Sequence, residues 1–233
     1  MSTKQPLVLV PGLLCTADLW QPQLDAFGDI ADISVADHTL HDTIAAVAAG
    51  ILADAPDRFA LAGLSMGGYV SLEIMRQAPE RVTRLALLDT SARADTSEQV
   101  QRRTDFIKLS EMGKFRGVTE ALLPILIHET RLDDEALVAT IYRMAQDIGQ
   151  VGFVRQQRAI MSRSDNRGLL GGISCPALVL CGRQDRLTPL DLHEEMAAGI
   201  AGAELVVLED CGHLSTLERP DQVNAVMRDW LAA

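Results

Sequence analysis

A serine lies between two glycines in residues 63–67, which read Gly-Leu-Ser-Met-Gly. The residues before Ser65 are apolar and those after Gly68 follow a helical pattern, so the chain is predicted to pass from a strand through a tight turn into a helix. Gly63 and Gly67 are expected where a Cβ atom would collide with a neighbouring strand or helix. Such a turn holds the serine in a sparsely populated backbone conformation and presents its hydroxyl for nucleophilic attack. Taken alone, the pentapeptide also fits an ordinary strand-to-helix turn with an exposed serine.

Asp185 and His213 follow two later apolar runs, and with Ser65 they give the chain order Ser, Asp, His. In that arrangement the histidine takes the serine proton as general base and returns it to the leaving group as acid. The aspartate holds the imidazole tautomer and stabilises its charge. The backbone N–H groups of Leu13 and Met66 are predicted to bind the oxyanion, and one such donor is typically worth about 3 kcal/mol of barrier.

Each of these residues also has a simpler interpretation. Asp185 could cap the helix expected at residues 190–199, since aspartate is common in such turns, and His213 could be an ordinary loop histidine. Asp89 is a rival acid, because it also follows a predicted strand. The serine turn, the residue order and the placement at strand ends together favour a catalytic triad over coincidence.

Short apolar runs that alternate with helical patterns must position these groups. The alternation predicts an α/β fold with a doubly wound, mainly parallel sheet of about six strands and helices on both faces. Reactive groups of such sheets gather beyond the carboxyl ends of the strands. The strands are expected at residues 6–10, 32–37, 59–62, 82–88, 177–181 and 204–208, and core helices at 42–55, 189–199 and 220–231.

The alternation stops over residues 92–170, where only helical patterns occur. This segment is far longer than a crossover needs, so we interpret it as a helical cap inserted into one domain formed by residues 1–91 and 171–233. Two lengthened crossover helices are the alternative interpretation. Glycines between its helices predict hinge motion, at Gly113, Gly117, Gly149 and Gly152.

Substrate selection is expected to lie in this cap. Apolar side chains could line a pocket there, among them Phe106, Met112, Phe115, Leu122, Leu123, Ile125, Ile127, Tyr142 and Phe153. One or two of the basic side chains in this segment are candidates to meet a substrate carboxylate, namely Arg102, Arg103, Lys108, Lys114 and Arg116. A solvated helical face is the usual interpretation of such charges.

Composition bounds the partners and the compartment. The 233 residues carry 21 basic and 32 acidic side chains, a formal net charge of −11 that disfavours nucleic acid and anionic membranes as partners.

No targeting segment is recognised and no apolar stretch approaches the length of a membrane span. No C-x-x-C pair occurs among the four cysteines, so we expect free thiols and a cytoplasmic protein, with Cys15 and Cys211 near the active-site loops. Neither a metal nor another cofactor is expected, and His38 and His41 are interpreted as solvated loop histidines.

The sequence resembles the α/β-hydrolase fold superfamily, in its esterase, lactonase and haloperoxidase-like branch with a helical cap. The resemblance implies Ser65, Asp185 and His213 as the triad and Leu13 and Met66 as oxyanion donors. It is carried by residues 7–14 (LVLVPGLL), 63–68 (GLSMGG), 181–189 (CGRQDRLTP) and 211–220 (CGHLSTLERP).

Two departures from the family pattern stand out. Pro11-Gly12 replaces the usual His-Gly of the oxyanion loop, so any supporting role of that histidine is lost. The chain starts directly at the strand before that loop, so the first hairpin of the family is expected to be absent or trimmed.

A serine nucleophile, in place of the aspartate used by relatives that open epoxides or displace halide, points to an acyl-enzyme that water resolves. The expected substrates are small carboxylic esters, thioesters or lactones, and the protein is expected to act as a monomer or homodimer. An acyltransferase and a receptor-like ligand-binding protein with little turnover are the alternatives.

Overall fold

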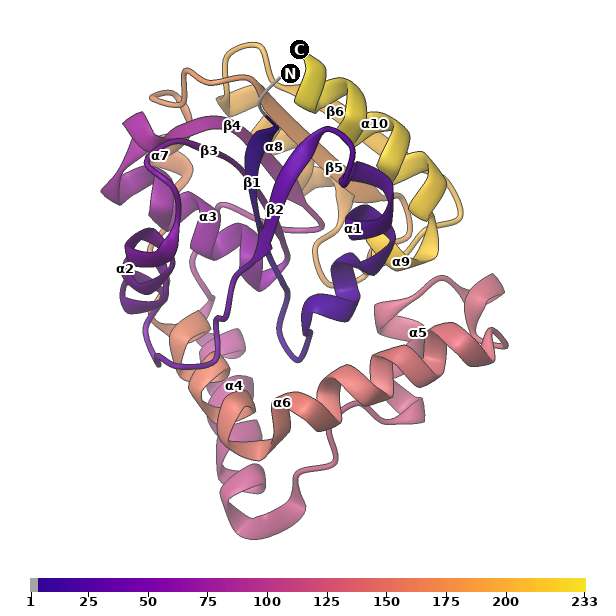
Figure 1. Cartoon of the computed structure of the whole chain (residues 1–233). Helices are drawn as coiled ribbons and strands as arrows, with labels where there is room; N and C mark the ends of the chain where they lie inside the picture. Colours follow the sequence, from indigo (N-terminus) through magenta and orange to yellow (C-terminus); the bar gives the residue numbers. More distant parts are fainter. Residues whose placement is uncertain (1–3) are drawn as a thin grey trace.

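The computed structural model describes residues 4–233, and its centre is one six-stranded sheet (Figure 1). The strand order is β2-β1-β3-β4-β5-β6, and every neighbouring pair is parallel. The predicted doubly wound parallel sheet of about six strands is confirmed. The strands are β1 (Gln5–Val10), β2 (Ala31–Val35), β3 (Phe59–Leu64), β4 (Val82–Leu88), β5 (Ala177–Gly182) and β6 (Glu204–Leu208).

Helices cover both faces of the sheet, which explains why the central strands are apolar on both sides. In β1, Leu7 and Leu9 pack into one core while Val8 and Val10 pack into the other, because successive side chains of a strand point to opposite faces. The first core is closed by α1 (Gln21–Phe27) and α10 (Pro220–Ala232), and the second by α2 (Ile44–Asp54), α3 (Met66–Gln77) and α8 (Leu190–Gly199).

Shorter helices connect these elements to the loops around the sheet. They are η1 (Ala17–Trp20), η2 (Pro79–Arg81), α7 (Arg167–Leu170) and α9 (Ser215–Glu218). The sheet order reverses between β1 and β3, so the loops that follow these two strands meet at the switch point where open α/β sheets bind ligands.

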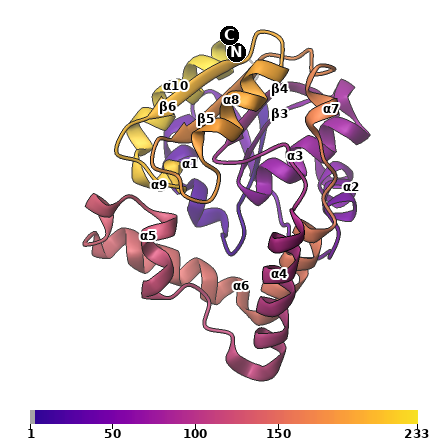
Figure 2. The ribbon, with the colours of Figure 1, turned by 180° about the vertical axis from the view of Figure 1, so that it is seen from behind.

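Residues 92–170, here called the helical insert, contain no strand, and all of the insert before residue 162 lies across one end of the core (Figures 1 and 2). The C-terminus and the start of β1 lie at the opposite end (Figure 1). The insert comprises α4 (Ser97–Leu109), η3 (Ser110–Lys114), η4 (Glu120–Leu122), α5 (Leu123–Leu126), η5 (Glu129–Arg131), α6 (Glu135–Met161) and α7.

The long helix α6 is interrupted at Gly149, whose φ of 65° and ψ of −176° are not helical. The sequence pattern predicts two helices here, and the break lies between them. Gly113 and Gly117 also adopt positive φ, of 75° and 62°, where a side chain would be strained. Gly152 instead lies within the helix, with its Cβ position 2.8 Å from the side chain of Ile148.

A buried ion pair network joins the two ends of the helical insert. The side chain of Asp95, 2% exposed, bonds Arg103 on α4 at 2.8 Å and Arg163 just after α6 at 2.6 Å. Arg103 also donates to Gln157 on α6 at 2.9 Å. The guanidinium of Arg163 stacks over the ring of Tyr69 in α3, 4.2 Å from its centroid, and so ties this end of the insert to the core.

Among residues 4–233, no helix combines the length and the apolar character that crossing a membrane requires.

Candidate active site

Ser65 lies between β3 and α3 with φ 56° and ψ −114°, the strained backbone that its sequence predicts. A Cβ atom at Gly63 would overlap the carbonyl of Gly67, and one at Gly67 would overlap the carbonyl of Val10. Both glycines therefore let α3 approach the ends of β1 and β3 closely enough to form the turn.

The last residue of β4 and the loop that follows it hold this turn. The N–H of Ser65 donates to the carbonyl of Leu88 at 2.9 Å, and the hydroxyl of Thr90 donates to the carbonyl of Ser65 at 2.8 Å. The N–H of Thr90 in turn donates to Nε2 of His193 at 2.9 Å. Burial lowers the pKa of His193 to about 4, so its imidazole is neutral and can accept this bond.

The structure brings Ser65, Asp185 and His213 together from three different loops. Nε2 of His213 lies 2.8 Å from Oγ of Ser65, and Nδ1 of His213 lies 2.8 Å from Oδ2 of Asp185. Thr188 supports the carboxylate, donating its hydroxyl to Oδ2 at 2.6 Å and its N–H to Oδ1 at 3.0 Å. The serine, histidine and carboxylate thus form one continuous hydrogen-bonded line.

Asp185 and His213 each favour the charged form of the other. Burial alone raises the pKa of Asp185, but the facing His213 and the hydrogen bonds from His213 and Thr188 outweigh it and hold the pKa below its ordinary value. Burial likewise lowers the pKa of His213, while the charge and hydrogen bond of Asp185 outweigh burial and raise it. Asp185 is therefore an ionised partner that favours the protonated imidazole.

Asp89, the rival acid, is buried beside the line but does not bond the imidazole in this structure. Its two carboxyl oxygens accept the N–H groups of Gly182 at 3.1 Å and Ser215 at 3.2 Å. Burial and the negative charge of Asp185 raise the pKa of Asp89 well above its ordinary value. Asp89 therefore braces β5 against α9 and leaves Asp185 as the acid that contacts His213.

The predicted oxyanion donors lie on either side of the nucleophile. Met66 is the first residue of α3, where the helix dipole favours negative charge. The Cβ position of Gly12 is 3.4 Å from Cβ of Ser65, so the loop that carries Leu13 lies against the serine. Within residues 4–233, the N–H groups of Leu13 and Met66 donate to no backbone or side-chain acceptor. Both donors are free to bind a ligand.

His38 is buried, which corrects the prediction that it is a solvated loop residue. Its side chain is 2% exposed, and its Nε2 lies 2.9 Å from the carbonyl oxygen of Gly12 and 3.1 Å from Nε2 of Gln156. The loop after β2 passes under α6, and this packing removes His38 from water. His41 is exposed, as predicted. In the described part of the chain, no three His, Cys, Asp or Glu side chains are grouped as a metal site requires.

Glu218 is a residue of the site that the sequence analysis did not single out. Its side chain is 1% exposed, and its carboxylate accepts the N–H groups of Gly212 at 3.0 Å, Leu214 at 3.2 Å and His128 at 2.7 Å. It therefore holds the loop on both sides of His213. A single glutamate in a short helix carries no sequence signal for this role.

All four cysteines are free thiols, and three of them are buried. Burial raises the pKa of Cys15 and of Cys181 to about 12 and raises that of Cys211 as well. These thiols therefore stay protonated near neutral pH and are poor nucleophiles, which leaves Ser65 as the candidate nucleophile of the site.

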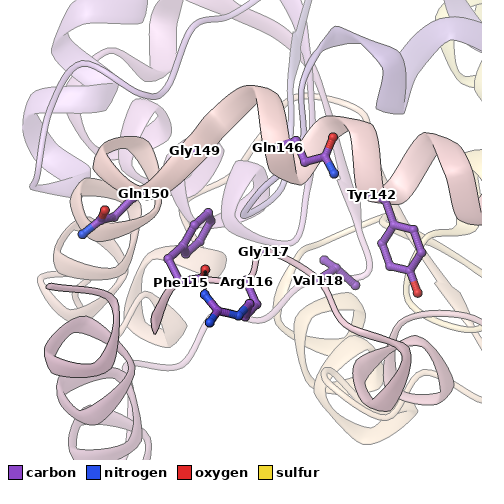
Figure 3. Close-up of a pocket in the computed structure, with 8 residues that line it drawn as sticks. All are labelled: Phe115, Arg116, Gly117, Val118, Tyr142, Gln146, Gly149 and Gln150. Carbon is purple, nitrogen blue, oxygen red and sulfur yellow. Dashed lines mark hydrogen bonds between the residues drawn. The ribbon is translucent and has the colours of Figure 1, made fainter. Parts of the chain in front are cut away.

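A cavity of about 520 Å³ opens between α6 and the loop before η4 (Figure 3). Phe115 and Arg116 line it from the loop, and Tyr142, Gln146 and Gln150 line it from α6 (Figure 3). Of the nine apolar residues expected to line a substrate pocket, Phe115 and Tyr142 line this cavity, and Ser65 is not part of it. Phe106, Met112 and Leu122 are exposed instead.

The arginines proposed to meet a substrate carboxylate have other surroundings. Arg103 is engaged by Asp95 and Gln157. Arg102 lines an open groove on the outer side of α4, together with residues such as Phe106. These contacts give no support to a carboxylate-binding role of Arg102 and Arg103, whereas Arg116 lines the cavity.

Comparison with known proteins agrees with this geometry. A 2-hydroxy-6-oxononadienedioate/2-hydroxy-6-oxononatrienedioate hydrolase of Klebsiella pneumoniae is 32% identical over 183 residues, which cover 76% of this chain and 63% of that relative, less than two thirds of its length. A thermophilic esterase from Thermogutta terrifontis has a TM-score of 0.89 at 28% identity, covering 99% of this chain and 90% of the other. The enol-lactonase from Burkholderia xenovorans LB400 has a TM-score of 0.89 at 26% identity, covering 100% and 93%. The sequence profile of the Alpha/beta hydrolase family matches residues 7–226, nearly the whole chain, and the protein therefore belongs to the α/β-hydrolase family.

Proposed function

We propose that this protein is a serine hydrolase that cleaves small carboxylic esters, thioesters or lactones through an acyl-enzyme on Ser65. The observation that carries the proposal is the line from Oγ of Ser65 through the imidazole of His213 to Asp185, with 2.8 Å at each of its two contacts. Two unpartnered N–H groups, on Leu13 and Met66, flank the nucleophile and complete what acyl transfer requires.

In the acylation step, Oγ of Ser65 attacks the carbonyl carbon while its proton moves to Nε2 of His213. The carbonyl oxygen becomes an oxyanion, and the N–H groups of Leu13 and Met66 stabilise its charge. When the tetrahedral intermediate collapses, the leaving alkoxide or thiolate takes the proton from Nε2. Asp185 holds Nδ1 throughout and stabilises the transient imidazolium.

In the deacylation step, water gives a proton to Nε2 of His213 and its oxygen attacks the acyl carbon. The second intermediate collapses, the carboxylic acid leaves, and Oγ of Ser65 regains its proton from the imidazole. For a lactone substrate the released alcohol and acid remain in one molecule, so a hydroxy acid is the single product.

We also propose that the helical insert, residues 92–170, caps the site of a core formed by residues 1–91 and 171–233. The contacts between the insert and the active-site loops support this role. The N–H of His213 donates to the carbonyl of Leu126 at 3.0 Å, and Gln156 accepts the N–H of Leu14 at 3.0 Å. The four free thiols support a further proposal, that the protein works in the reducing cytoplasm.

Hydrolysis of a series of p-nitrophenyl esters, from acetate to decanoate, tests the proposed activity. Wild type, Ser65→Ala and the exposed control Ser97→Ala are compared, and intact mass is measured after treatment with a fluorophosphonate. We expect turnover and one label in wild type and Ser97→Ala, and neither in Ser65→Ala. A label without turnover of any ester would favour the receptor-like alternative, and equal activity in Ser65→Ala would refute the proposal.

A further inference from the structure

The loop after β1 has consecutive N–H groups on Leu13, Leu14 and Cys15. Those of Leu14 and Cys15 form hydrogen bonds within the protein. The N–H of Leu14 donates to Oε1 of Gln156 at 3.0 Å. The N–H of Cys15 donates to the carbonyl of Gly12 at 3.1 Å. Within residues 4–233 the N–H of Leu13 has no acceptor. The loop therefore leaves one N–H available, and it is the one beside the nucleophile.

The carbonyl groups of the same loop are held as well. The carbonyl oxygen of Gly12 belongs to the peptide whose N–H is that of Leu13, and it lies 2.9 Å from Nε2 of His38. Because a peptide unit is planar, fixing this oxygen also fixes the direction of the Leu13 N–H. The carbonyl of Leu13 accepts the thiol of Cys15 at 3.5 Å, and that thiol is protonated because burial raises its pKa to about 12.

The loop needs these hydrogen bonds because its backbone is strained at Leu14. Leu14 has a φ of 59°, an uncommon conformation for a residue with a Cβ atom, which persists only where its surroundings impose it. Gln156 and His38 are 0% and 2% exposed, so water does not compete for these bonds. Removing the acceptor would leave the buried N–H of Leu14 without a hydrogen bond, which is unfavourable and would let the loop change conformation.

Gln156 and His38 also contact each other. The bond from Leu14 fixes the orientation of the Gln156 amide, so its Nε2 faces Nε2 of His38 at 3.1 Å. Nε2 of His38 bonds one of these two partners at a time. When it carries a proton it donates to the carbonyl oxygen of Gly12, and when it does not it accepts an N–H of the Gln156 amide. In both tautomers Gln156 keeps the N–H of Leu14.

We propose that Gln156 and His38 are positioning residues that hold the oxyanion loop so that the N–H of Leu13 faces the substrate carbonyl. This inference rests on the proposed serine hydrolase function. It gives α6 an indirect part in the chemistry, because Gln156 connects the position of this helix to the loop that carries the oxyanion donor. Neither residue touches the reacting atoms.

A Gln156→Met variant tests the proposal, because methionine keeps the length of the side chain and lacks the amide acceptor. We expect kcat for a p-nitrophenyl ester to fall about 10- to 100-fold with KM within about threefold, a fraction of what a lost oxyanion donor costs. The inhibition constant of a trifluoromethyl ketone, which forms a tetrahedral oxyanion on Ser65, should rise by a similar factor. This constant does not depend on the fraction of active protein, so a merely structural role would leave it unchanged.

The matched control is Gln157→Met, because Gln157 is also buried on α6 but bonds Arg103 instead of the loop. It should keep the wild-type inhibition constant even if it unfolds at a lower temperature. His38→Ala should behave like Gln156→Met, whereas His38→Gln, which retains an N–H donor near the position of Nε2, should recover part of the loss.

Amide hydrogen exchange in the wild-type protein tests the same geometry without a variant. The N–H of Leu14 should be protected and that of Leu13 should exchange freely until the ketone adduct forms. Equal exchange of the two amides, or a wild-type inhibition constant in Gln156→Met, would overturn the inference. If wild type itself neither cleaves esters nor binds the ketone, the proposed function fails instead, and the exchange rates still decide whether Gln156 holds Leu14.

Discussion

The backbone N–H of His213 donates a 3.0 Å hydrogen bond to the carbonyl oxygen of Leu126, which lies in the helical insert. Glu218 extends this contact, since its carboxylate accepts N–H groups from Gly212 next to the histidine and from His128 in the insert. A Cβ atom at Gly212 would lie 2.8 Å from the backbone of the insert. The proposed general base is thus carried on a loop that the insert holds directly.

Glu218→Gln should therefore lower both stability and kcat. Glutamine offers one acceptor oxygen where the carboxylate uses both, so at least one buried N–H group loses its partner, at a cost of about 1–3 kcal/mol. We expect kcat to fall about tenfold as the His213 loop loosens, since one misplaced group in a site is costly. Urea unfolding and ester hydrolysis measure the two effects. Glu209→Gln is the control, because Glu209 is exposed and pairs with Arg183 at the surface. Identical unfolding midpoints for the two variants would contradict this role of Glu218.

Asp185→Asn should mainly lower kcat, whereas Asp89→Asn should mainly lower the stability of the fold. Asp185 contacts the imidazole at 2.8 Å, and loss of its charge and of the correct tautomer should lower kcat on the order of 10³- to 10⁴-fold. Asp89 accepts the backbone N–H groups of Gly182 and Ser215 and does not contact the imidazole, so its replacement should cost about 1–3 kcal/mol of stability and less than about tenfold in kcat. Steady-state kinetics and denaturant unfolding of both variants separate these effects. A larger kcat loss in Asp89→Asn would make Asp89 the catalytic acid.

The activity should fall on the acid side as His213 becomes protonated. Burial lowers the pKa of His213, but the charge and hydrogen bond of Asp185 outweigh it, so the pKa lies above the ordinary value of 6.5. Since the base acts in its neutral form, kcat/KM should rise with pH through that raised pKa. NMR titration of the imidazole in Ser65→Ala reports the same group without turnover. The midpoint should move down when Asp185→Asn is added, and a midpoint at or below 6.5 before that addition would refute this assignment.

His193 should make the stability depend on pH below neutrality. Its pKa is lowered by burial to about 4 in the folded protein and lies near 6.5 when unfolded, so the unfolded state binds the proton first as the pH falls. The stabilisation is complete above pH 6.5 and declines towards pH 4, by about 3 kcal/mol in total. In His193→Gln, the amide oxygen can still accept the N–H of Thr90 but does not titrate. Urea unfolding at pH 7 and pH 4 should therefore show a smaller loss in the variant, and parallel losses would contradict the assignment.

The sequence was sufficient where local pattern decides structure. The serine turn depends on two glycines and an apolar strand within ten residues, and the structure places Gly63 and Gly67 where a side chain cannot fit. The strands were found because buried parallel strands are nearly all apolar, as β3 and β5 are. Their alternation with helices then fixed the parallel topology.

The residues that support the site could not be found in this way. Gln156 contacts Leu14, which is 142 residues away in the sequence, and His38, which is 118 residues away. A single glutamine or histidine belongs to no sequence pattern that would predict such a partner. At Pro11, the resemblance to the family led us to expect a histidine, and the structure brings the imidazole of His38 to the same loop from the end of β2. Tertiary packing alone decides these contacts.

The break in α6 at Gly149 separates two attachments of the helical insert. Before it, the insert holds the His213 loop through Leu126 and His128, and after it Gln156 holds the loop of Leu13. The stretch from residue 134 to 149 lies between these attachments and carries Tyr142 and Gln146 of the cavity (Figure 3). We therefore expect that substitutions at Tyr142 and Gln146 can reshape this cavity while the loops of His213 and Leu13, which are held on either side of the break, keep their positions.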